Sequence, residues 1–187
     1  MKFLRVGFRL SVMIKDRKIV DVILKLAGRK GWADVTVASV AKALRVAPAS
    51  FKKRFVSPEA FVPLVMAEAT RVSLAEVPSD GESAHDALFA ILMARFDFLS
   101  AHKKAVLSIA SAAREDRALL RAWTGACFEG MRQTLWAAGE KGQPLSVVAL
   151  MGVYGWAFWA WRNDDTSDLS KTMAALDRAL RWYGVGS

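Results

Sequence analysis

The chain has 187 residues, 53% of them hydrophobic, with 27 Lys and Arg against 18 Asp and Glu. This composition allows a sizeable apolar core and excludes a disordered chain. The single cysteine, Cys127, excludes an intrachain disulfide and a CxxC metal site. It also indicates a reducing compartment, so we expect a cytoplasmic protein.

The positive charge is concentrated in the first third of the chain. Residues 1–60 carry 14 Lys and Arg and 4 Asp and Glu, whereas residues 61–187 carry 13 and 14. This asymmetry predicts a polyanionic partner for the N-terminal part, either nucleic acid or an anionic membrane surface. The alternative, a basic face that meets only solvent, stays open.

Two interpretations of residues 1–12 are open. They form a basic arm, with Arg5 and Arg9 one helical turn apart, or they precede the true start at Met13. The two arginines interrupt the apolar residues, so this segment lacks the apolar core of a signal peptide.

Helical periodicity then dominates the basic module. Residues 16–30 place their apolar side chains on one face, and Gly31 is predicted to end this helix. A second helix is predicted over residues 37–44, with Thr36 as its N-cap. A three-residue turn leads to a third helix, which runs from Pro48 to about Phe55.

The rest of the chain is also predicted to be helical. Ser57, as an N-cap followed by Pro58, predicts a fourth helix to about residue 76, and the polar stretch "VPSDGES" predicts a linker over residues 77–83. Asp168 is predicted to cap the last helix. We therefore expect an all-α protein of about nine helices, an N-terminal helix-turn-helix bundle plus a C-terminal helical domain. The later helices are predicted near residues 84–100, 102–113, 116–138, 145–161 and 168–183.

The most apolar run of the chain, Val147–Trp161, has about 15 residues. A bilayer needs roughly 20, so this run predicts a buried helix or a helix–helix interface and no transmembrane segment.

The sequence shows no catalytic constellation. Both histidines, His85 and His102, stand alone in the sequence, and no glycine-rich phosphate loop is present. Cys127 is predicted to be buried packing, and "NDD" at residues 163–165 is predicted to be a solvated turn. We therefore expect no enzyme activity, no cofactor and no metal site.

Residues 23–61, "ILKLAGRKGWADVTVASVAKALRVAPASFKKRFVSPEAF", resemble the TetR family of bacterial regulators. The resemblance implies an all-α homodimer that binds a palindromic operator through N-terminal helix-turn-helix domains. It implies a DNA-binding domain over residues 13–60, a connecting helix and linker over 61–83, and a dimerisation and effector domain over 84–187. The DNA-binding positions that the resemblance implies are Thr36, Ala47, Pro48, Ala49, Ser50, Lys52 and Lys53, and we add Arg45 of the turn as an expected DNA-binding position.

In this assignment Ala49 and Ser50 face base edges and the lysines hold phosphates. The chain departs from the family at three positions. Arg45 replaces the usual turn glycine, which predicts a reshaped turn. Lys52 replaces a tyrosine, and Pro58 replaces a phosphate-binding lysine. Substitutes for the lost contact are Lys42, Lys53 and Arg54.

The C-terminal half has a second resemblance. "DALFAILMARFDFLSAHKKAVLSI" and "WRNDDTSDLSKTMAALDRALR" are similar to TetR-like lipid-binding accessory proteins of ubiquinone biosynthesis, which do not need DNA. Two functions are therefore open. The first is a transcriptional regulator that binds double-stranded DNA and an apolar small-molecule or lipid effector. The second is a lipid-binding accessory protein of quinone metabolism.

The aromatic residues of this half are interpreted as core and dimer interface, or as the lining of an apolar pocket. The TetR resemblance places dimerisation in residues 145–183. The dimer-interface positions are Ala149, Gly152, Trp156 and Trp159. The expected ligand positions are Phe96, Trp123 and Trp136.

Overall fold

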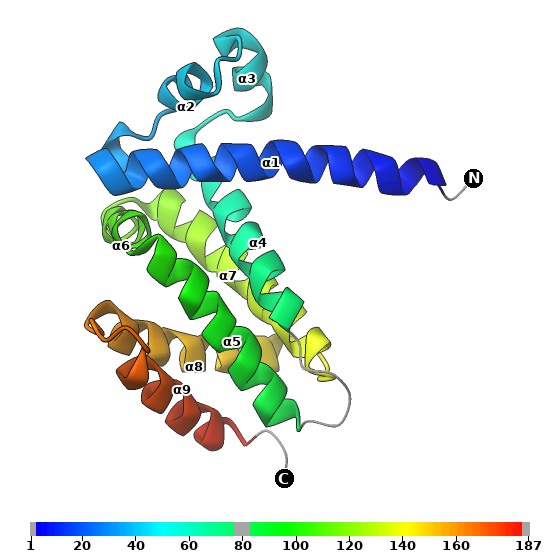
Figure 1. Ribbon diagram of the computed structural model, residues 1–187, viewed down its shortest axis with the longest axis vertical. Coiled ribbons are helices and arrows are strands. Elements are labelled where there is room, and N and C mark those ends of the chain that lie inside the picture. Colours follow the sequence, from blue (N-terminus) through cyan, green and yellow to red (C-terminus); the bar gives the residue numbers. More distant parts are fainter. Residues whose placement is uncertain (1–2, 77–82, 185–187) are drawn as a thin grey trace. The chain divides into compact units, whose positions relative to one another are not determined.

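The computed structural model describes the backbone of residues 3–76 and 83–184, and their side chains except for 3–15, Ser50 and Glu76. These ranges contain nine α-helices, three short 3-10 helices and no strand, which confirms the all-α prediction (Figure 1). The predicted linker, residues 77–83, lies outside the described residues except for Ser83. The elements in chain order are α1 (Phe3–Lys30), η1 (Trp32–Asp34), α2 (Val37–Leu44), α3 (Pro48–Arg54), η2 (Pro58–Phe61), α4 (Val62–Ser73), η3 (Leu74–Glu76), α5 (Ala84–Ala101), α6 (Lys103–Ala112), α7 (Arg117–Ala137), α8 (Pro144–Arg162) and α9 (Ser170–Tyr183).

The helices form two compact units that interleave along the chain. The first unit comprises residues 1–68 and 102–123, and the second comprises residues 69–101 and 124–187. The first therefore contains α1, α2, α3 and α6 with one end each of α4 and α7. The second contains α5, α8 and α9 with the remaining parts of α4 and α7.

α1 organises the first unit. α2 and α3 lie on one side of it and α6 lies on the other (Figure 1). α1 ends at Gly31, as predicted, because Gly31 takes a φ of 91° that favours glycine. The residue after Gly31 connects the end of α1 to α6, because the backbone N–H of Trp32 donates to Ser108 Oγ of α6 at 2.7 Å.

The predicted continuous helix from Ser57 is wrong in its first turn. Residues 58–61 form the 3-10 helix η2, the side chain of Ser57 makes no capping hydrogen bond, and α4 begins at Val62. Pro63 gives the physical reason: it has no N–H to bond back to Glu59, and it fits only within the first turn of an α-helix.

Side-chain hydrogen bonds join α8 to its neighbours in the second unit. Trp161 Nε1 of α8 donates to Ser100 Oγ of α5 at 2.8 Å. At the other end of α8, the hydroxyl of Tyr183, the last residue of α9, donates to the carbonyl of Ser146 at 3.0 Å. α8 and α9 lie side by side in the view of Figure 1.

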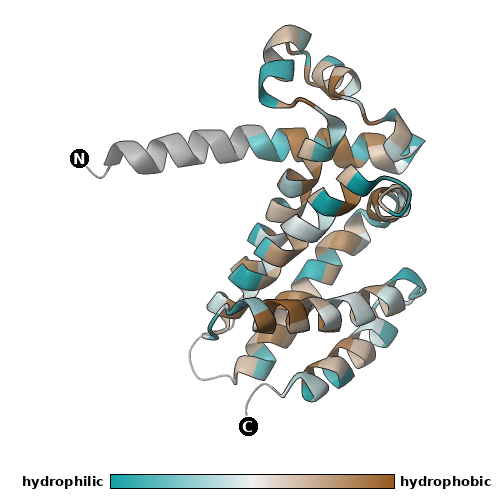
Figure 2. Cartoon of the chain, turned by 180° about the vertical axis from the view of Figure 1, so that it is seen from behind, coloured by the Kyte–Doolittle hydropathy of each residue, from teal (hydrophilic) through white to brown (hydrophobic). Residues whose placement is uncertain are grey.

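α8 has 19 residues and is long and apolar enough to cross a membrane by length and composition alone. It is drawn mainly in brown in Figure 2, whereas α9 mixes brown and teal. One side of α8 is nevertheless buried within the unit, through Val147, Leu150, Val153, Tyr154, Ala157 and Trp161. This stripe at helical spacing is typical of a helix packed in a folded unit.

Asp164 organises the connection between α8 and α9. Its side chain is 2% exposed. It accepts hydrogen bonds from the backbone N–H and hydroxyl of Thr166 at 3.1 and 2.5 Å, and from those of Thr172 at 2.8 Å each. The predicted solvated turn at residues 163–165 is therefore wrong at Asp164. The predicted cap of α9 is also wrong by one residue: Leu169, in a left-handed conformation, is the N-cap, and Asp168 before it accepts from the N–H of Ser170 at 3.2 Å.

Burial opposes ionisation of Asp164, but the hydrogen bonds from Thr166 and Thr172 outweigh it and hold the pKa of this carboxyl well below its usual value. We therefore expect Asp164→Asn to lower the free energy of unfolding at pH 7 by about 2 kcal/mol, as for hydrogen bonds to a charged group. The carboxylate stabilises the fold fully above its unfolded-state pKa of about 3.9. This stability is lost as pH falls through the lower folded-state pKa, so the difference between wild type and variant should narrow below about pH 4.

Urea unfolding at several pH values measures this difference. Asp97→Asn, at an exposed position of α5, is the control and should leave stability nearly unchanged. Equal effects of the two substitutions at pH 7 would contradict the role of Asp164.

Candidate nucleic-acid interface and association surface

α2 begins at a reciprocal cap. Thr36 Oγ1 accepts from the backbone N–H of Ser39 at 3.0 Å, and Ser39 Oγ accepts from the backbone N–H of Thr36 at 2.9 Å. This confirms Thr36 as the N-cap, while the part played by Ser39 was missed, because that position usually carries Glu or Gln. The cap orients α2 and leaves the exposed Thr36 at its N-terminus.

The turn between α2 and α3 keeps the conformation that glycine would adopt. Arg45 is left-handed, with φ 57° and ψ 38°, and its N–H donates to the carbonyls of Ala41 and Lys42. The N–H of Val46 closes the turn by donating to the carbonyl of Ala41 at 3.1 Å. The expectation of a reshaped turn is therefore wrong. Arg45 itself adopts the left-handed conformation, which is strained for a residue with a Cβ.

α3 is held by an aromatic cluster. Phe51 and Phe55, one helical turn apart, are both buried, with ring centroids 4.8 Å apart. The ring of Phe61 in η2 lies 5.0 Å from that of Phe55 and 6.1 Å from that of Phe51. Since this face of a seven-residue helix is buried, the opposite face is turned outward.

The outward face of α3 carries Lys52 and Lys53, both exposed. Lys42 of α2 and Arg45 of the turn are exposed as well, so four cationic side chains occupy the helix-turn-helix surface. Arg54 belongs to the fold instead. Its guanidinium pairs with Asp16 of α1 and lies 4.9 Å from the centroid of the Phe55 ring.

Uncharged residues occupy the start of α3. Ala47, Pro48 and Ala49 are exposed, and Pro48 is the first helical residue, as predicted. The side chain of Ser50 lies outside the described residues. The structure thus brings together, on one exposed surface, the turn and the start of α3 with the two lysines. Thr36 lies at the other end of α2, as its N-cap.

A second exposed surface lies on α8 and is free of charge over most of its length. No charged residue occurs between Pro144 and Trp161. The exposed positions recur at helical spacing and include both tryptophans predicted for the dimer interface. They are Leu145, Val148, Ala149, Gly152, Gly155, Trp156 and Trp159.

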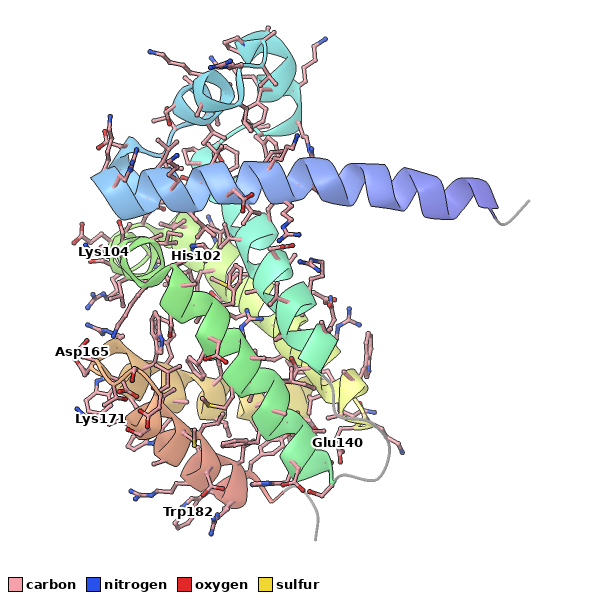
Figure 3. All side chains as sticks on the ribbon, in the orientation of Figure 1. His102, Lys104, Glu140, Asp165, Lys171 and Trp182 are labelled. Carbon is pink, nitrogen blue, oxygen red and sulfur yellow. The ribbon has the colours of Figure 1, made fainter. Side chains whose placement is uncertain are left out.

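We call this set the α8 face. On the neighbouring helix α9, Met173 and Trp182 are also exposed, and Trp182 projects outward from the last turn (Figure 3).

The interior of the second unit contains a buried arginine that the sequence analysis missed. Arg95 of α5 is fully buried and donates to Thr70 Oγ1 of α4 at 2.7 Å and to the Tyr154 hydroxyl at 3.4 Å. Gly130 of α7 makes room for this group, because a Cβ there would lie 2.8 Å from Thr70 Oγ1. Four helices therefore meet at one cationic side chain.

Burial raises the pKa values of the neighbouring Cys127 thiol and Tyr154 hydroxyl, so both stay protonated at neutral pH. Cys127 is buried, as predicted. Within residues 3–76 and 83–184, no three His, Cys, Asp or Glu side chains gather as a metal site requires.

The three expected ligand positions occupy different environments. Phe96 is fully buried and stacks on Tyr154 at 5.2 Å between ring centroids. Trp136 is half exposed near the end of α7, under the guanidinium of Arg132 at 4.2 Å. Trp123 is half-buried and belongs to the first unit. Their role in ligand binding stays a prediction.

No protein-family model and no curated protein matches this chain. Solved structures do match its fold. A TetR transcriptional regulator from Nitrosomonas europaea matches with a TM-score of 0.72 and 20% identity, over 90% of this chain and 96% of that one. A TetR transcriptional regulator from a Rhodococcus species matches with a TM-score of 0.69 and 22% identity, over 90% and 94%.

The fatty acid degradation regulator FadR from Bacillus halodurans matches more distantly, with a TM-score of 0.52 and 15% identity over 89% of this chain and 94% of that one. The chain therefore has the fold of TetR-family transcriptional regulators.

The Arg95 cluster generates a prediction that compares two buried threonines. Thr70→Val removes a hydrogen bond to a buried charge, and we expect it to lower the free energy of unfolding by about 2 kcal/mol. Thr134→Val removes only a neutral bond to the Gly130 carbonyl, 3.0 Å long, and should cost about 1 kcal/mol or less. Chemical denaturation of both variants measures the difference. A smaller effect at Thr70 than at Thr134 would contradict a stabilising role for the charged bond.

Proposed function

We propose that this chain is a TetR-like transcriptional regulator that binds a palindromic operator as a homodimer and responds to an apolar effector. The observation that carries the proposal is the outward surface of α3. Its buried phenylalanines fix the helix, and this leaves Lys52 and Lys53 exposed with a small uncharged surface at the helix start. A short helix presented in this way is what the major groove of DNA accepts.

The two kinds of side chain on this surface suit two kinds of contact. Lys52 and Lys53 suit phosphates, which supply affinity irrespective of sequence. Ala47, Pro48 and Ala49 suit the methyl groups of thymines at the base edges. So few polar side chains leave little direct base recognition, and we infer that the shape of the operator contributes much of the specificity.

The α8 face supports the homodimer. Trp156 and Trp159 are more than half exposed, and a monomer would leave them in water. Gly152 and Gly155 lie beside them inside a helix, where glycine weakens the structure, and a Cβ at either would meet no other atom within 4 Å. The chain itself thus gives no packing reason for these glycines.

A second copy of the chain, packed against the α8 face, would give a packing reason for Gly152 and Gly155. The face combines large side chains with small ones and carries no charge, so it is complementary to itself across a two-fold axis. Pairing through it would give two copies of α3, as a palindrome requires.

The interior of the second unit supports an apolar effector. Aromatic rings of α5 and α8 gather there: Phe96, Tyr154, Phe158 and Trp161 form a chain with centroid separations of 5.1–6.2 Å. An effector that inserts among such rings changes operator affinity only if it binds one arrangement of the two DNA-binding units better than the other.

DNA binding is tested by selecting fragments from sheared genomic DNA at about 0.15 M salt. We expect enrichment of one palindromic site. Lys52→Ala/Lys53→Ala should lower the affinity for that site at least about tenfold, because a dimer would lose about four phosphate contacts, and should flatten its salt dependence.

The control is Lys104→Ala/Arg114→Ala, which removes the same charge from exposed positions of the first unit. Lys104 lies on α6, on the other side of α1 from α3 (Figure 3), and Arg114 follows α6 in the chain. Wild-type protein that retains all fragments weakly and equally would contradict the regulator. Extraction of bound isoprenoid or phospholipid would then favour the lipid-binding alternative.

Dimerisation is tested with Gly152→Leu/Gly155→Leu. The new side chains enter open space in a single copy, so the fold should persist, but they would hold two α8 helices apart. We expect wild type to sediment as a dimer at micromolar concentration and the variant as a monomer with unchanged helicity.

Gly125→Leu is the matched control. Gly125 is an exposed glycine inside α7, and a Cβ there also meets no atom within 4 Å. A dimer that persists in Gly152→Leu/Gly155→Leu would refute the α8 face as the interface. Equal dissociation of the dimer in Gly125→Leu would refute it as well.

A further inference from the structure

Arg45 occupies a strained backbone position that nothing in its own unit explains. Among the described residues, only Arg45 and Leu169 have a positive φ without being glycine. Leu169 is buried at the start of α9, so packing of its side chain accounts for it. The side chain of Arg45 is exposed. A left-handed residue with a Cβ is disfavoured, and glycine would adopt the same conformation without strain.

The turn does not need the arginine side chain. Its closing hydrogen bonds come from the backbone N–H groups of Arg45 and Val46 to carbonyls of α2, and glycine would preserve both. The guanidinium makes no hydrogen bond or ion pair with any described side chain. A cation does favour the C-terminus of a helix, but Lys42 already lies in the last turn of α2.

The position of Arg45 is what distinguishes it. It lies three residues before Pro48, where α3 begins, and it is continuous in sequence with the exposed residues at the start of that helix. Lys42 precedes it and Lys52 follows it on the same helix-turn-helix surface. Asp16 of α1 is paired with Arg54 at the end of α3. The turn therefore places positive charge directly before the start of α3.

We infer that Arg45 is a DNA-phosphate contact supplied by the turn itself, and that the strain of the turn is retained for this contact. The inference rests on the proposed function, since it requires α3 to bind duplex DNA. A guanidinium suits the role because it binds a phosphate with two parallel hydrogen bonds and is always charged. Strained backbone positions that persist without a packing reason are found at binding sites.

The experiment separates stability from binding. Arg45→Gly and Arg45→Asn both relieve the strain, since glycine and asparagine tolerate the left-handed region, and both remove the charge. Arg45→Lys keeps the charge and the strain. Arg114→Gln removes one charge from an exposed position of the same unit. The probe is a mixed-sequence duplex of roughly 30 base pairs, long enough for two half-sites.

Affinity is measured at several salt concentrations between about 50 and 200 mM, and the midpoint of thermal unfolding is measured alongside. We expect Arg45→Gly and Arg45→Asn to unfold at or above the wild-type temperature and yet to bind several-fold more weakly. The slope of log affinity against log salt should fall by about 0.9 for each lost contact, or nearly 2 for a dimer. Arg45→Lys should keep most of the slope, and Arg114→Gln should keep all of it.

Wild-type slope and affinity in both Arg45→Gly and Arg45→Asn would overturn the inference. If Lys52→Ala/Lys53→Ala still weakened binding in that case, the proposed regulator would stand and only the role of Arg45 would fail. If the wild-type chain showed no salt-dependent binding to the duplex, the proposed function and this inference would fail together.

Discussion

Burial of two phenylalanines, Phe51 and Phe55, determines what the N-terminal surface of this protein presents. A helix of seven residues is not stable alone in water, so α3 exists because its aromatic side is packed. Phe61 completes the packing from η2, and the pairing of Arg54 with Asp16 attaches the end of α3 to α1. Because the phenylalanine side of α3 is buried, Lys52 and Lys53 on the opposite side point to solvent. The packing of this core therefore fixes the candidate DNA-binding surface.

Among its described residues, the second unit has two buried charged groups, Arg95 and Asp164, and different hydrogen-bond partners satisfy each of them. Asp164 accepts from two threonines and thereby joins the end of α8 to the start of α9. Arg95 donates to neutral hydroxyls of other helices, at a point where only a glycine of α7 leaves room. Both charges act across helices, because a buried charge requires directed hydrogen bonds and so restricts the helices that supply them.

Local preferences are broken at a few exposed positions of the chain. Arg45 takes a backbone conformation suited to glycine, while Gly152 and Gly155 lie inside a helix, where alanine would be more stable. None of these choices is compensated by a neighbour within its own unit. Such departures from local preference are expected on surfaces that bind a partner. Here they occur on the two surfaces that we propose bind DNA and a second copy of the chain.

Much of the local structure could be predicted from the sequence. α2 begins after Thr36 and ends at Leu44 as expected, and Gly31 ends α1, because caps and glycines act over a few residues. The position of Lys52 and Lys53 on a short basic helix followed from the same spacing. An error arose where distant residues compete: Asp164 was expected in a solvated turn but is buried. Arg54, named as a possible substitute phosphate contact, pairs with Asp16 of α1.

The sequence by itself therefore determined most of the helices, the cap at Thr36, the end of α1 at Gly31 and the basic character of the first third of the chain. Only the tertiary structure decided that α6 packs with the N-terminal helices, that Arg95 is buried and that the glycines of α8 face outward. The reason is physical: helical spacing shows which side chains share a face. Which face is buried depends on partners far away in the sequence, which periodicity does not identify.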